Sequence, residues 1–380
     1  MNQLINTTES EWRDWLWQLR HAKRSLEDLK ELELYSNTEY LQLKLVMKKF
    51  KTLVTPYYLS LIDRNDPFCP IRLQALPDPQ ELSFYDGEQE DPIGDKAHAP
   101  TPILVHRYPD RALLFPTFEC PMFCRYCFRK ESLNTEPIKL HQDLPKSLTY
   151  LTQNPEIKEI ILSGGDPLML SSNKLGQLIH KLVDIGIKRL RIHSRTPVTL
   201  PQRINVDLLT CIAQYLPKIT ITLITHFNHP KELSHLAKEG LTKLKDLGIV
   251  VLNQSVLLKG VNNNIEILKN LFYELGDQGV LPYYLHHPDL TRGTHHFRCS
   301  IDEGLLLYRM LRGQISGYLL PRYVIDIPGG GGKVEVDSSA VIKGKQPGEW
   351  LLTSPLTKQT QHYFDLAAQK HNNANSSSLV

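Results

Sequence analysis

Three cysteines lie close together in the stretch Cys120-Pro-Met-Phe-Cys124-Arg-Tyr-Cys127. Their thiolates could hold three irons of a 4Fe–4S cluster and leave the fourth iron open to a ligand from outside the protein. A structural zinc site is the alternative, and it usually has four ligands arranged as two close-spaced pairs. Since no Cys-x2-Cys or His-x3-His pair follows, the spacing favours an open iron–sulfur cluster.

A run of four glycines after Pro328 ends at Lys333. Consecutive glycines lose much conformational entropy when they become ordered, so an ordered loop here must serve a purpose. The run does not match a phosphate-binding P-loop, because Pro328 replaces its first glycine and Val334 its Ser or Thr. A lysine on such a loop could form a Schiff base with an aldehyde cofactor such as pyridoxal phosphate. The alternative is a flexible linker with an incidental lysine.

The segment His106-Arg-Tyr-Pro-Asp-Arg111 could supply a phosphate clamp for that cofactor. Arg107 and Arg111 offer guanidinium groups, which suit bidentate contacts with phosphate, and Tyr108 adds a phenol. The alternative is an exposed basic turn.

A second glycine-rich segment, Ser163-Gly164-Gly165, follows an apolar run. Two adjacent glycines let the backbone approach a ligand closely. The alternative is an ordinary turn between a strand and a helix.

Three charged side chains could bind an amino-acid substrate. Asp289 and Asp326 lie near the ends of apolar runs, where a carboxylate is costly to bury unless a cation meets it. Together they could therefore hold a substrate ammonium, while Arg129 could bind a substrate carboxylate. The alternatives are helix caps or structural ion pairs for the two aspartates and a surface charge for the arginine.

The composition is that of a soluble globular protein, with 41% hydrophobic and 22% charged residues in a chain of 380. No run of eighteen apolar residues predicts a membrane span, and the N-terminus does not resemble a signal peptide. A net charge of +3 is too small to indicate nucleic-acid binding. Six cysteines in a chain this long do not form a disulfide framework, and an open cluster is sensitive to oxygen, so we expect a cytoplasmic location.

The order of apolar runs predicts an α/β fold. Residues 1–100 are expected to form an N-terminal helical region followed by a solvated linker over residues 78–102, with a capping box at Thr8 and Glu11. Apolar runs at 112–115, 159–162, 189–192, 219–224, 250–253 and 281–285 alternate with helical patterns. This alternation predicts a parallel sheet, and six units favour a partial (β/α)6 barrel over residues 101–335. Residues 336–380 are expected to form an extension with a frayed polar end from about residue 369.

Taken together, these residues resemble the lysine 2,3-aminomutases, which are radical S-adenosylmethionine enzymes that also use pyridoxal phosphate. The resemblance runs from about residue 12 to residue 333. Besides the cysteine motif, it includes Glu11-Trp-Arg-Asp-Trp15, His106-Arg-Tyr-Pro-Asp-Arg111, Ser163-Gly-Gly-Asp166, Ser194-Arg-Thr-Pro197, Thr225-His-Phe-Asn-His-Pro230, Asn253-Gln-Ser-Val-Leu-Leu258, Ser316-Gly-Tyr318 and Asp326-x-Pro-Gly-Gly-Gly-Gly-Lys333.

The resemblance implies that a 4Fe–4S cluster, S-adenosylmethionine and pyridoxal phosphate are the cofactors. The implied roles are cluster ligation by Cys120, Cys124 and Cys127, contact with S-adenosylmethionine by Ser163, Gly164 and Gly165, pyridoxal attachment at Lys333, phosphate contact by Arg107, Tyr108, Arg111 and Gln254, carboxylate binding by Arg129, and binding of the distal lysine ammonium by Asp289 and Asp326. The implied reaction moves the amino group of L-lysine from C2 to C3. A reductant such as flavodoxin or ferredoxin and a homo-oligomeric assembly are also implied.

The sequence departs from the longer members of that family in two places. They carry extra cysteines for a structural zinc, but Asn264 replaces one of these and no cysteine follows Cys299, so zinc is not expected. Phe128 after the cysteine motif resembles the shorter relatives that make β-lysine for elongation factor P. Those relatives, which lack the four-glycine run and Asp326, remain one alternative, and an aminomutase for arginine or glutamate is another. Relatives that act on glutamate have different residue types at the two aspartate positions.

Two further classes of function stay open at this point. One is a redox or regulatory iron–sulfur protein, which would not need Lys333 or a phosphate clamp. The other is a radical methylase or maturase that acts on a macromolecule, which would need no Schiff-base lysine and would be expected to have a basic surface.

Overall fold

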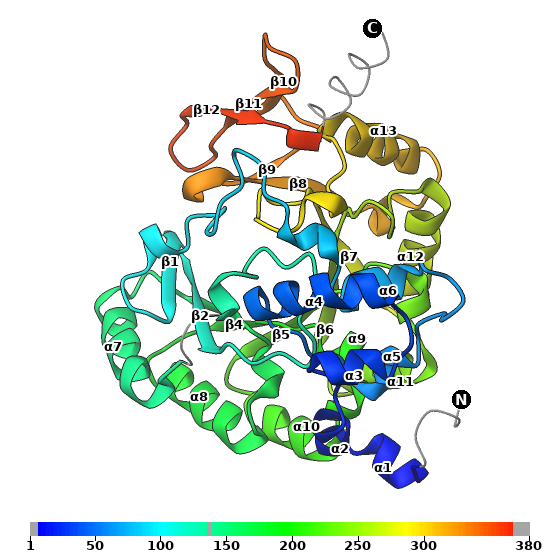
Figure 1. The fold of residues 1–380 in the computed structure, drawn as a ribbon. Helices are drawn as coiled ribbons and strands as arrows, with labels where there is room; N and C mark the ends of the chain where they lie inside the picture. The colour runs from blue at the N-terminus through cyan, green and yellow to red at the C-terminus, as the bar shows by residue number, and fades with distance from the viewer. Residues whose placement is uncertain (1–6, 135–137, 368–380) are drawn as a thin grey trace, which may run out of the picture.

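The computed structural model describes residues 7–134 and 138–367 and is built around one large sheet flanked by helices (Figure 1). The strands of this sheet are β1 (Leu104–Tyr108), β2 (Arg111–Thr117), β3 (Glu159–Gly164), β4 (Arg189–His193), β5 (Thr220–Thr225), β6 (Val250–Val256), β7 (Leu281–His286), β8 (Arg322–Ile327) and β9 (Gly332–Glu335). They pair across the sheet in this same order, so strands that follow each other in the chain are neighbours in space.

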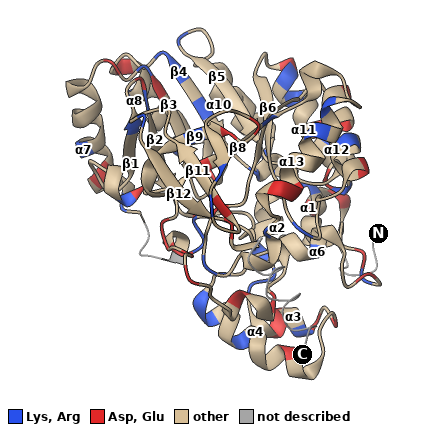
Figure 2. Ribbon diagram, turned by 90° about the horizontal axis from the view of Figure 1, so that it is seen from above, with Lys and Arg blue, Asp and Glu red and all other residues tan. Residues whose placement is uncertain are grey.

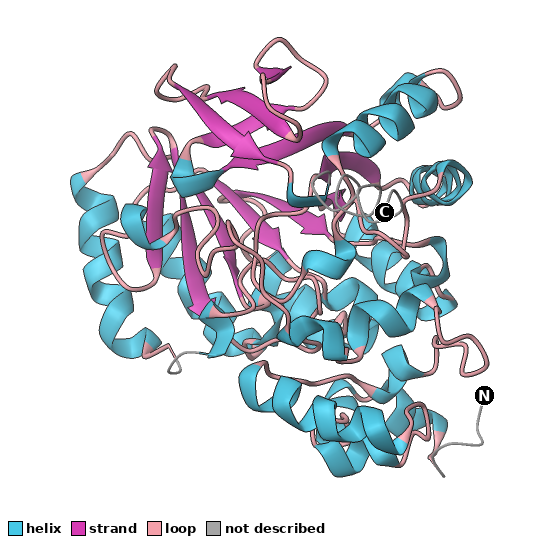
Figure 3. Cartoon of the chain, turned by 45° about the horizontal axis from the view of Figure 1, so that its top comes forward, coloured by secondary structure: helices cyan, strands magenta, loops and turns pink. Residues whose placement is uncertain are grey.

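Strands β2 to β8 run parallel, and β1 and β9 pair antiparallel at the two ends of the series. The helices after these strands are α7 (Leu140–Gln153), α8 (Ser172–Asp184), α9 (Thr196–Thr199), α10 (Val206–Ala213), α11 (His235–Asp246), α12 (Ile265–Asp277) and α13 (Ile301–Arg312). Helices surround the curved sheet from outside, which confirms the expected partial barrel (Figure 3). The six expected runs correspond to β2–β7, and β8 is a further parallel strand that the sequence analysis did not count.

Helix α8 illustrates how the outer helices pack on the sheet. Leu175, Leu178 and Leu182 recur at helical spacing and are buried on one face of the helix. The Ser171 hydroxyl caps its first turn, and Gly186, with a φ of +86°, follows its end. Burial of each leucine contributes roughly 1.5–3 kcal/mol, so this face holds the helix in place.

The N-terminal region begins with the predicted capping box. The Thr8 hydroxyl accepts a hydrogen bond from the backbone N–H of Glu11 at 3.2 Å, and the Glu11 carboxylate accepts one from the Thr8 N–H at 2.9 Å. The Asp14 carboxylate then accepts from the Leu16 N–H and starts a new helix, so the helical stretch is divided into short pieces. These are α1 (Glu9–Arg13), α2 (Trp15–Arg20), α3 (Leu26–Lys30), α4 (Asn37–Lys49), α5 (Pro56–Leu59) and α6 (Pro70–Ala75).

Residues 78–102, which we call the covering segment, are only in part the solvated linker expected from their composition, because exposed stretches alternate with buried ones. Glu81 is fully buried and Ile93 is nearly so. Gly94 has a φ of +69°, and a Cβ atom on it would lie 2.6 Å from the carbonyl carbon of Gly329. The expectation was wrong for the buried stretches, because this segment packs directly on the backbone of the four-glycine run.

Strands β10 (Val341–Lys343), β11 (Glu349–Thr353) and β12 (Thr360–Phe364) form a separate antiparallel sheet (Figure 3). The Ser354 hydroxyl, just after β11, donates a hydrogen bond to the Gly331 carbonyl at 2.6 Å. The glycine run is therefore held by the small sheet at Gly331 and contacted by the covering segment at Gly329. The polar end expected from about residue 369 lies outside the described residues.

The surface of the described residues carries charges of both signs. Figure 2 shows basic and acidic residues interspersed over α11 and α12 rather than separated onto different faces. Across the described residues, the helices are too short or too polar for any of them to traverse a lipid bilayer.

We expect Gly304→Ala to lower the free energy of unfolding by about 1–3 kcal/mol, the usual cost of overpacking a core. A Cβ on Gly304 would overlap the hydroxyl oxygen of Tyr323, which is buried and bonded to His287 at 2.9 Å. The better helix propensity of alanine, worth up to about 1 kcal/mol, offsets only part of this. Urea unfolding measures the change.

The matched control is Gly313→Ala, where the nearest atom to an added Cβ is the Met310 carbonyl oxygen at 3.8 Å. It should leave stability unchanged or slightly increased. Equal stability of the Gly304 variant and the native protein would contradict the packing argument.

Candidate active site at the mouth of the barrel

The carboxyl ends of the parallel strands meet at one rim of the barrel, where such folds place functional residues. Most residues predicted from the sequence lie at this rim: Cys120, Cys124, Cys127 and Arg129 after β2, Ser163 and Gly164 at the end of β3, Gly165 just beyond it, Gln254 in β6, Asp289 after β7, and Asp326 in β8. The remaining ones come from the two ends of the sheet: Arg107 and Tyr108 from β1, Arg111 from the start of β2, and Lys333 from β9.

The three cysteines are free thiols that interact electrostatically with one another. Burial, followed by the charge of Cys124, raises the pKa of Cys127 to about 11. Burial, Asp166 and the other two thiolates likewise raise the pKa of Cys120. Three thiolates here need positive charge between them, and the irons of a cluster would supply it. Among the described residues, no three His, Cys, Asp or Glu side chains are grouped as ligands of a single metal ion.

The cysteine loop, residues 118–130 after β2, is anchored to the N-terminal region by a buried triad of charges. The Glu81 carboxylate is fully buried and accepts hydrogen bonds from Arg125 Nε at 2.8 Å and Lys130 Nζ at 2.5 Å. Burial would raise the pKa of Glu81, but the two cations outweigh it and hold the pKa at about 2. Burial lowers the pKa of Lys130 to about 8, so its ammonium remains charged at neutral pH. Arg125 also donates to the Lys51 carbonyl at 2.8 Å, which fixes the residue after Cys124.

Arg195, to which the sequence analysis assigned no role, reaches the same loop from the end of β4. Its Nη1 donates a hydrogen bond to Cys124 Sγ at 2.9 Å, and its Nη2 donates to Glu232 Oε1 at 2.6 Å. The motif Ser194-Arg-Thr-Pro197 belonged to the family resemblance and was the one available signal. It did not indicate the contact with the cysteine, which lies 71 residues away in the chain.

The two glycines after β3 are required by close packing of backbone on backbone. Gly164 has a φ of +96°, and a Cβ on Gly165 would lie 2.6 Å from the carbonyl carbon of Phe118. The Gly165 N–H donates to the Thr117 carbonyl at 2.8 Å. The glycines therefore let the rim of β3 approach the start of the cysteine loop. Ser163 also faces this region, since its hydroxyl accepts from Arg129 Nη1 at 3.3 Å.

Lys333 lies opposite Asp326 in the antiparallel pairing of β8 with β9. Its ammonium donates to both carboxylate oxygens of Asp326, at 2.6 and 2.5 Å. Its backbone N–H donates to the hydroxyl of Tyr108 at 3.1 Å. The structure therefore brings together three residues that were predicted to bind cofactor or substrate.

Arg107 is almost fully buried and points away from bulk solvent. Its Nη2 donates to the Ile93 carbonyl at 2.6 Å and to Asp95 Oδ1 at 3.1 Å, while its Nε is buried without a partner. An unpaired donor of this kind is costly unless a ligand satisfies it, which fits a bound phosphate. The Arg111 guanidinium stacks on the ring of Tyr108, 3.9 Å from its centroid, and also pairs with Asp110.

Asp95 joins the predicted cofactor clamp to the predicted substrate arginine. While one of its oxygens accepts from Arg107, the other accepts from Arg129 Nε at 3.0 Å and lies 2.9 Å from Arg129 Nη2. The Arg129 guanidinium is buried and lies over the ring of Phe115 at 4.8 Å. The sequence analysis missed Asp95 because it treated the covering segment as solvated.

Asp289 is partly buried and lies beside Asp326, which is buried. Burial, followed by the negative charge of Asp326, raises the pKa of Asp289 to about 7. Burial would also raise the pKa of Asp326, but Lys333 and His286 outweigh it and hold that pKa below its usual range. The His286 ring nitrogen lies 3.8 Å from the carboxylate of Asp326. The two carboxyl groups together therefore carry more negative charge than the single ammonium of Lys333 neutralises.

Gln254 is the predicted site residue with the fewest contacts to the other predicted site residues. It pairs with Tyr284 in the register of β6 and β7, and its side chain is half buried. Within the described ranges, no hydrogen bond joins it to Arg107 or Arg111.

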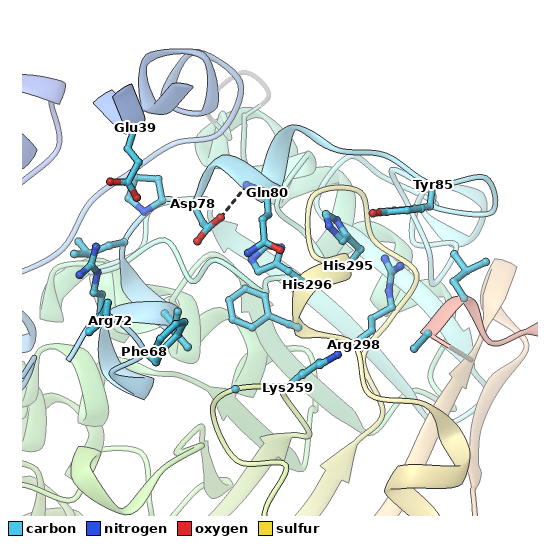
Figure 4. A pocket seen from close by; sticks show the side chains of 18 of the residues that line it. Glu39, Phe68, Arg72, Asp78, Gln80, Tyr85, Lys259, His295, His296 and Arg298 are labelled. Atoms are coloured by element: carbon cyan, nitrogen blue, oxygen red, sulfur yellow. Dashed lines mark hydrogen bonds between the residues drawn. The ribbon is translucent and has the colours of Figure 1, made fainter. Parts of the chain in front are cut away.

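Two cavities differ in their relation to these residues. One of about 460 Å³ is lined by Asp95, Phe115 and Arg129, so it opens onto the predicted carboxylate site. A larger cavity of about 820 Å³ lies between the N-terminal helices and the loops after β6 and β7, where Arg72 and His296 line it (Figure 4). All predicted site residues lie in described ranges, and none of them lines this larger cavity. The volume of a cavity therefore does not identify the site.

Comparison with known proteins adds an independent finding. Residues 114–271 match the model of the radical SAM superfamily, and residues 308–347 match a lysine-2,3-aminomutase model. The chain is 41% identical to the L-lysine 2,3-aminomutase of Fusobacterium nucleatum over 89% of its own length and 79% of that relative. It is 39% identical to the enzyme of the same name from Clostridium subterminale, over 89% and 81% of the two chains. It is 36% identical to a glutamate 2,3-aminomutase from Clostridioides difficile, over 87% and 78%.

We expect Glu81→Gln to destabilise the protein by about 3–5 kcal/mol at pH 7, because it leaves two cations buried without their counter-ion. The depressed pKa of Glu81 means that its stabilising effect is complete above pH 4.5 and is lost as the pH falls toward 2. The difference between native and variant protein should therefore shrink in that range. Urea unfolding of the metal-free protein at several pH values measures it.

The matched control is Glu90→Gln, which removes an exposed pair with Arg292 at 2.7 Å. Such pairs contribute about 0–1 kcal/mol. A loss of stability as small for Glu81→Gln as for this control would show that the triad does not anchor the loop.

Proposed function

The chain belongs to the lysine 2,3-aminomutase family of radical S-adenosylmethionine isomerases, and from this premise we propose that it converts L-lysine to L-β-lysine. The observation that carries the proposal is the pair of neighbouring carboxyl groups, buried Asp326 and partly buried Asp289, beside Lys333. Two carboxyl groups in one site select a substrate with a cationic side chain.

The ligand-free arrangement supports this choice of substrate. Asp326 is neutralised by the ammonium of Lys333, and Asp289 has no ion-pair partner of its own among the described residues. If the amine of Lys333 held pyridoxal phosphate, Asp326 would lose the counter-ion that it has here. The distal ammonium of lysine could replace it and also meet Asp289, since a charge-assisted hydrogen bond forms best with an ionised partner.

We propose the cofactor set of 4Fe–4S cluster, S-adenosylmethionine and pyridoxal phosphate, with the cluster ligated by Cys120, Cys124 and Cys127. When bound, the cluster and S-adenosylmethionine supply a hydrogen-abstracting radical, and pyridoxal phosphate carries the migrating nitrogen. Buried Arg107, with its unpaired Nε, and Tyr108 next to Lys333 are suited to hold a phosphate group near that lysine. Arg111 and Gln254 complete the proposed clamp, and Ser163, Gly164 and Gly165 the proposed S-adenosylmethionine contact.

The protein's own residues would then act by orientation. Arg129 can bind the α-carboxylate at one end of lysine, while the two aspartates bind the ammonium at the other end. Fixing both ends places C2 and C3 between them, which converts a bimolecular encounter into an oriented one. The covering segment limits access of water to the site, because it packs against the glycine run and holds Arg107 and Arg129 through Asp95.

The alternative functions are an aminomutase that acts on glutamate, one that acts on arginine, and one that makes β-lysine for elongation factor P. Glutamate would place a side-chain carboxylate against Asp289 and Asp326, so like charges would oppose its binding. Arginine could also pair with two carboxylates, and its greater length is what would disfavour it. The four-glycine run and Asp326 argue against the enzyme type that serves elongation factor P.

The remaining parts of the proposal concern the setting of the enzyme. We propose a catalytic core over residues 101–335, with an N-terminal helical region over 1–100 and an extension over 336–380. A cytoplasmic location suits an oxygen-sensitive cluster. The reaction needs a low-potential electron donor such as flavodoxin or ferredoxin, and a homo-oligomer would be consistent with the family resemblance.

The test of the reaction is anaerobic incubation of reconstituted protein with L-lysine, S-adenosylmethionine, pyridoxal phosphate and dithionite. Amino-acid analysis should detect β-lysine. Asp326→Asn should lower kcat/KM for lysine about tenfold to over a hundredfold, because loss of a charge-assisted hydrogen bond costs roughly 1.5–3 kcal/mol. Asp302→Asn, which removes an exposed ion pair with Lys343, is the control and should not change turnover. Turnover of glutamate equal to that of lysine would refute the substrate assignment.

Attachment of pyridoxal phosphate can be tested separately from turnover. Borohydride reduction should fix the cofactor to Lys333, and peptide mass mapping should locate it there, since the backbone N–H of Lys333 donates to Tyr108 of the proposed phosphate clamp. Lys333→Ala should abolish the adduct. Lys343→Ala, which changes an exposed lysine, should not. An adduct on another lysine of the native protein would rule out this assignment.

A further inference from the structure

The guanidinium of Arg195 is buried next to the cysteine loop and has a single fixed orientation. Its Nη1 donates to Cys124 Sγ at 2.9 Å, and its Nε donates to the His226 carbonyl at 3.2 Å. Its Nη2 donates to Glu232 at 2.6 Å and to Gln74 at 2.7 Å. Every nitrogen of the group therefore has an acceptor, and these acceptors come from the cysteine motif, from Gln74 and from the stretch 226–232 after β5.

Glu232 is the residue that keeps this arrangement rigid. Its side chain is fully buried and accepts from the Tyr58 hydroxyl at 2.6 Å with one oxygen and from the Asn228 N–H at 2.7 Å with the other. The Arg195 guanidinium also lies 5.3 Å from the ring centroid of Tyr126, within the cysteine motif. A cation held this firmly cannot turn away from Cys124 when the charge at the cysteine changes.

The three cysteines are not equivalent in this respect. In the described ranges, Cys124 accepts a hydrogen bond from a charged side chain, whereas no charged side chain donates one to Cys120 or Cys127. A hydrogen bond to a ligand sulfur is one of the protein features that set the potential of an iron–sulfur cluster. Both a hydrogen bond to the sulfur and a nearby positive charge raise the reduction potential, because each interacts more favourably with the more negative, reduced state.

We propose that Arg195 is a positioning residue that raises the reduction potential of the cluster through Cys124, and so favours its acceptance of one electron. The inference rests on the cluster put forward under the proposed function. The step itself is a simple electron transfer: a low-potential donor loses one electron, the cluster gains it, and no bond is made or broken. Arg195 remains protonated throughout, because its partners Cys124 and Glu232 are both acceptors.

A purely structural role is the competing explanation, because Arg195 also joins segments through Glu232 and Gln74. The two explanations differ in what they predict for the potential. A structural role would affect stability and iron content, whereas the proposed role shifts the potential of a cluster that is otherwise intact.

The decisive experiment is a potentiometric titration of the anaerobically reconstituted holoprotein, followed by electron paramagnetic resonance. Arg195→Lys should retain about four irons per chain but should be harder to reduce. We expect its reduction equilibrium to shift about tenfold toward the oxidised state, which is about 59 mV for one electron. Arg203→Lys is the matched control, because Arg203 is also an enclosed arginine but donates to the Leu168 and Leu170 carbonyls and has no hydrogen bond to a cysteine of the motif. Its potential should equal that of the native protein.

A second measurement on the native protein does not depend on folding of the variant. In protein labelled with ¹⁵N in the arginine guanidinium groups alone, hyperfine spectroscopy of the reduced cluster should detect a guanidinium nitrogen coupled to it; the label omits the backbone nitrogen of Arg129, which donates to Cys127. No such coupling, or an unchanged potential in Arg195→Lys with full iron content, would overturn the inference while leaving the aminomutase proposal intact. Failure of the native protein to bind iron would instead refute the proposed cluster itself.

Discussion

Charges buried at the rim of the barrel have to be neutralised by other charges of the protein, and the whole site depends on this constraint. An ion removed from water without a partner costs several kcal/mol. The acidic side chains here meet the constraint with cations from distant parts of the chain: Glu81 with Arg125 and Lys130, Asp95 with Arg107 and Arg129, Glu232 with Arg195, and Asp326 with Lys333. Neutralising these charges therefore also fixes the relative positions of the cysteine loop, the covering segment and the glycine run.

The same pairs also hold the hydrogen-bond donors of the site in fixed positions. Asp95 holds two guanidinium groups in place before any anion arrives, so a phosphate or carboxylate would meet donors that need little rearrangement. The Lys333 ammonium pairs with the Asp326 carboxylate in a similar way. Asp289 departs from this pattern, because burial and its acidic neighbour raise its pKa to about 7. An unmatched carboxyl group of this kind marks the position where the protein lacks a cation and a substrate could supply one.

Packing of backbone on backbone is the second condition for the site. Four consecutive glycines would cost much entropy to order without support. Gly94 of the covering segment contacts the run at Gly329, and Ser354 holds it through the Gly331 carbonyl. At the other side of the rim, Gly165 lets β3 approach the start of the cysteine loop. In each case a side chain would separate the two backbones, so glycine is needed for proximity as much as for flexibility.

The sequence by itself determined the features that depend on near neighbours. The spacing of the cysteines, the strands β2–β7, the capping box at Thr8 and the glycine run could all be read from it, and family resemblance added the roles proposed for Lys333 and the two aspartates. Only the tertiary structure revealed that Arg195 donates to Cys124, that Asp95 joins two arginines, and that the covering segment buries Glu81 and Ile93. Local conformation follows from interactions within a few residues. Which charges come together depends on how distant strands and loops are aligned in the barrel, and no local pattern encodes that alignment.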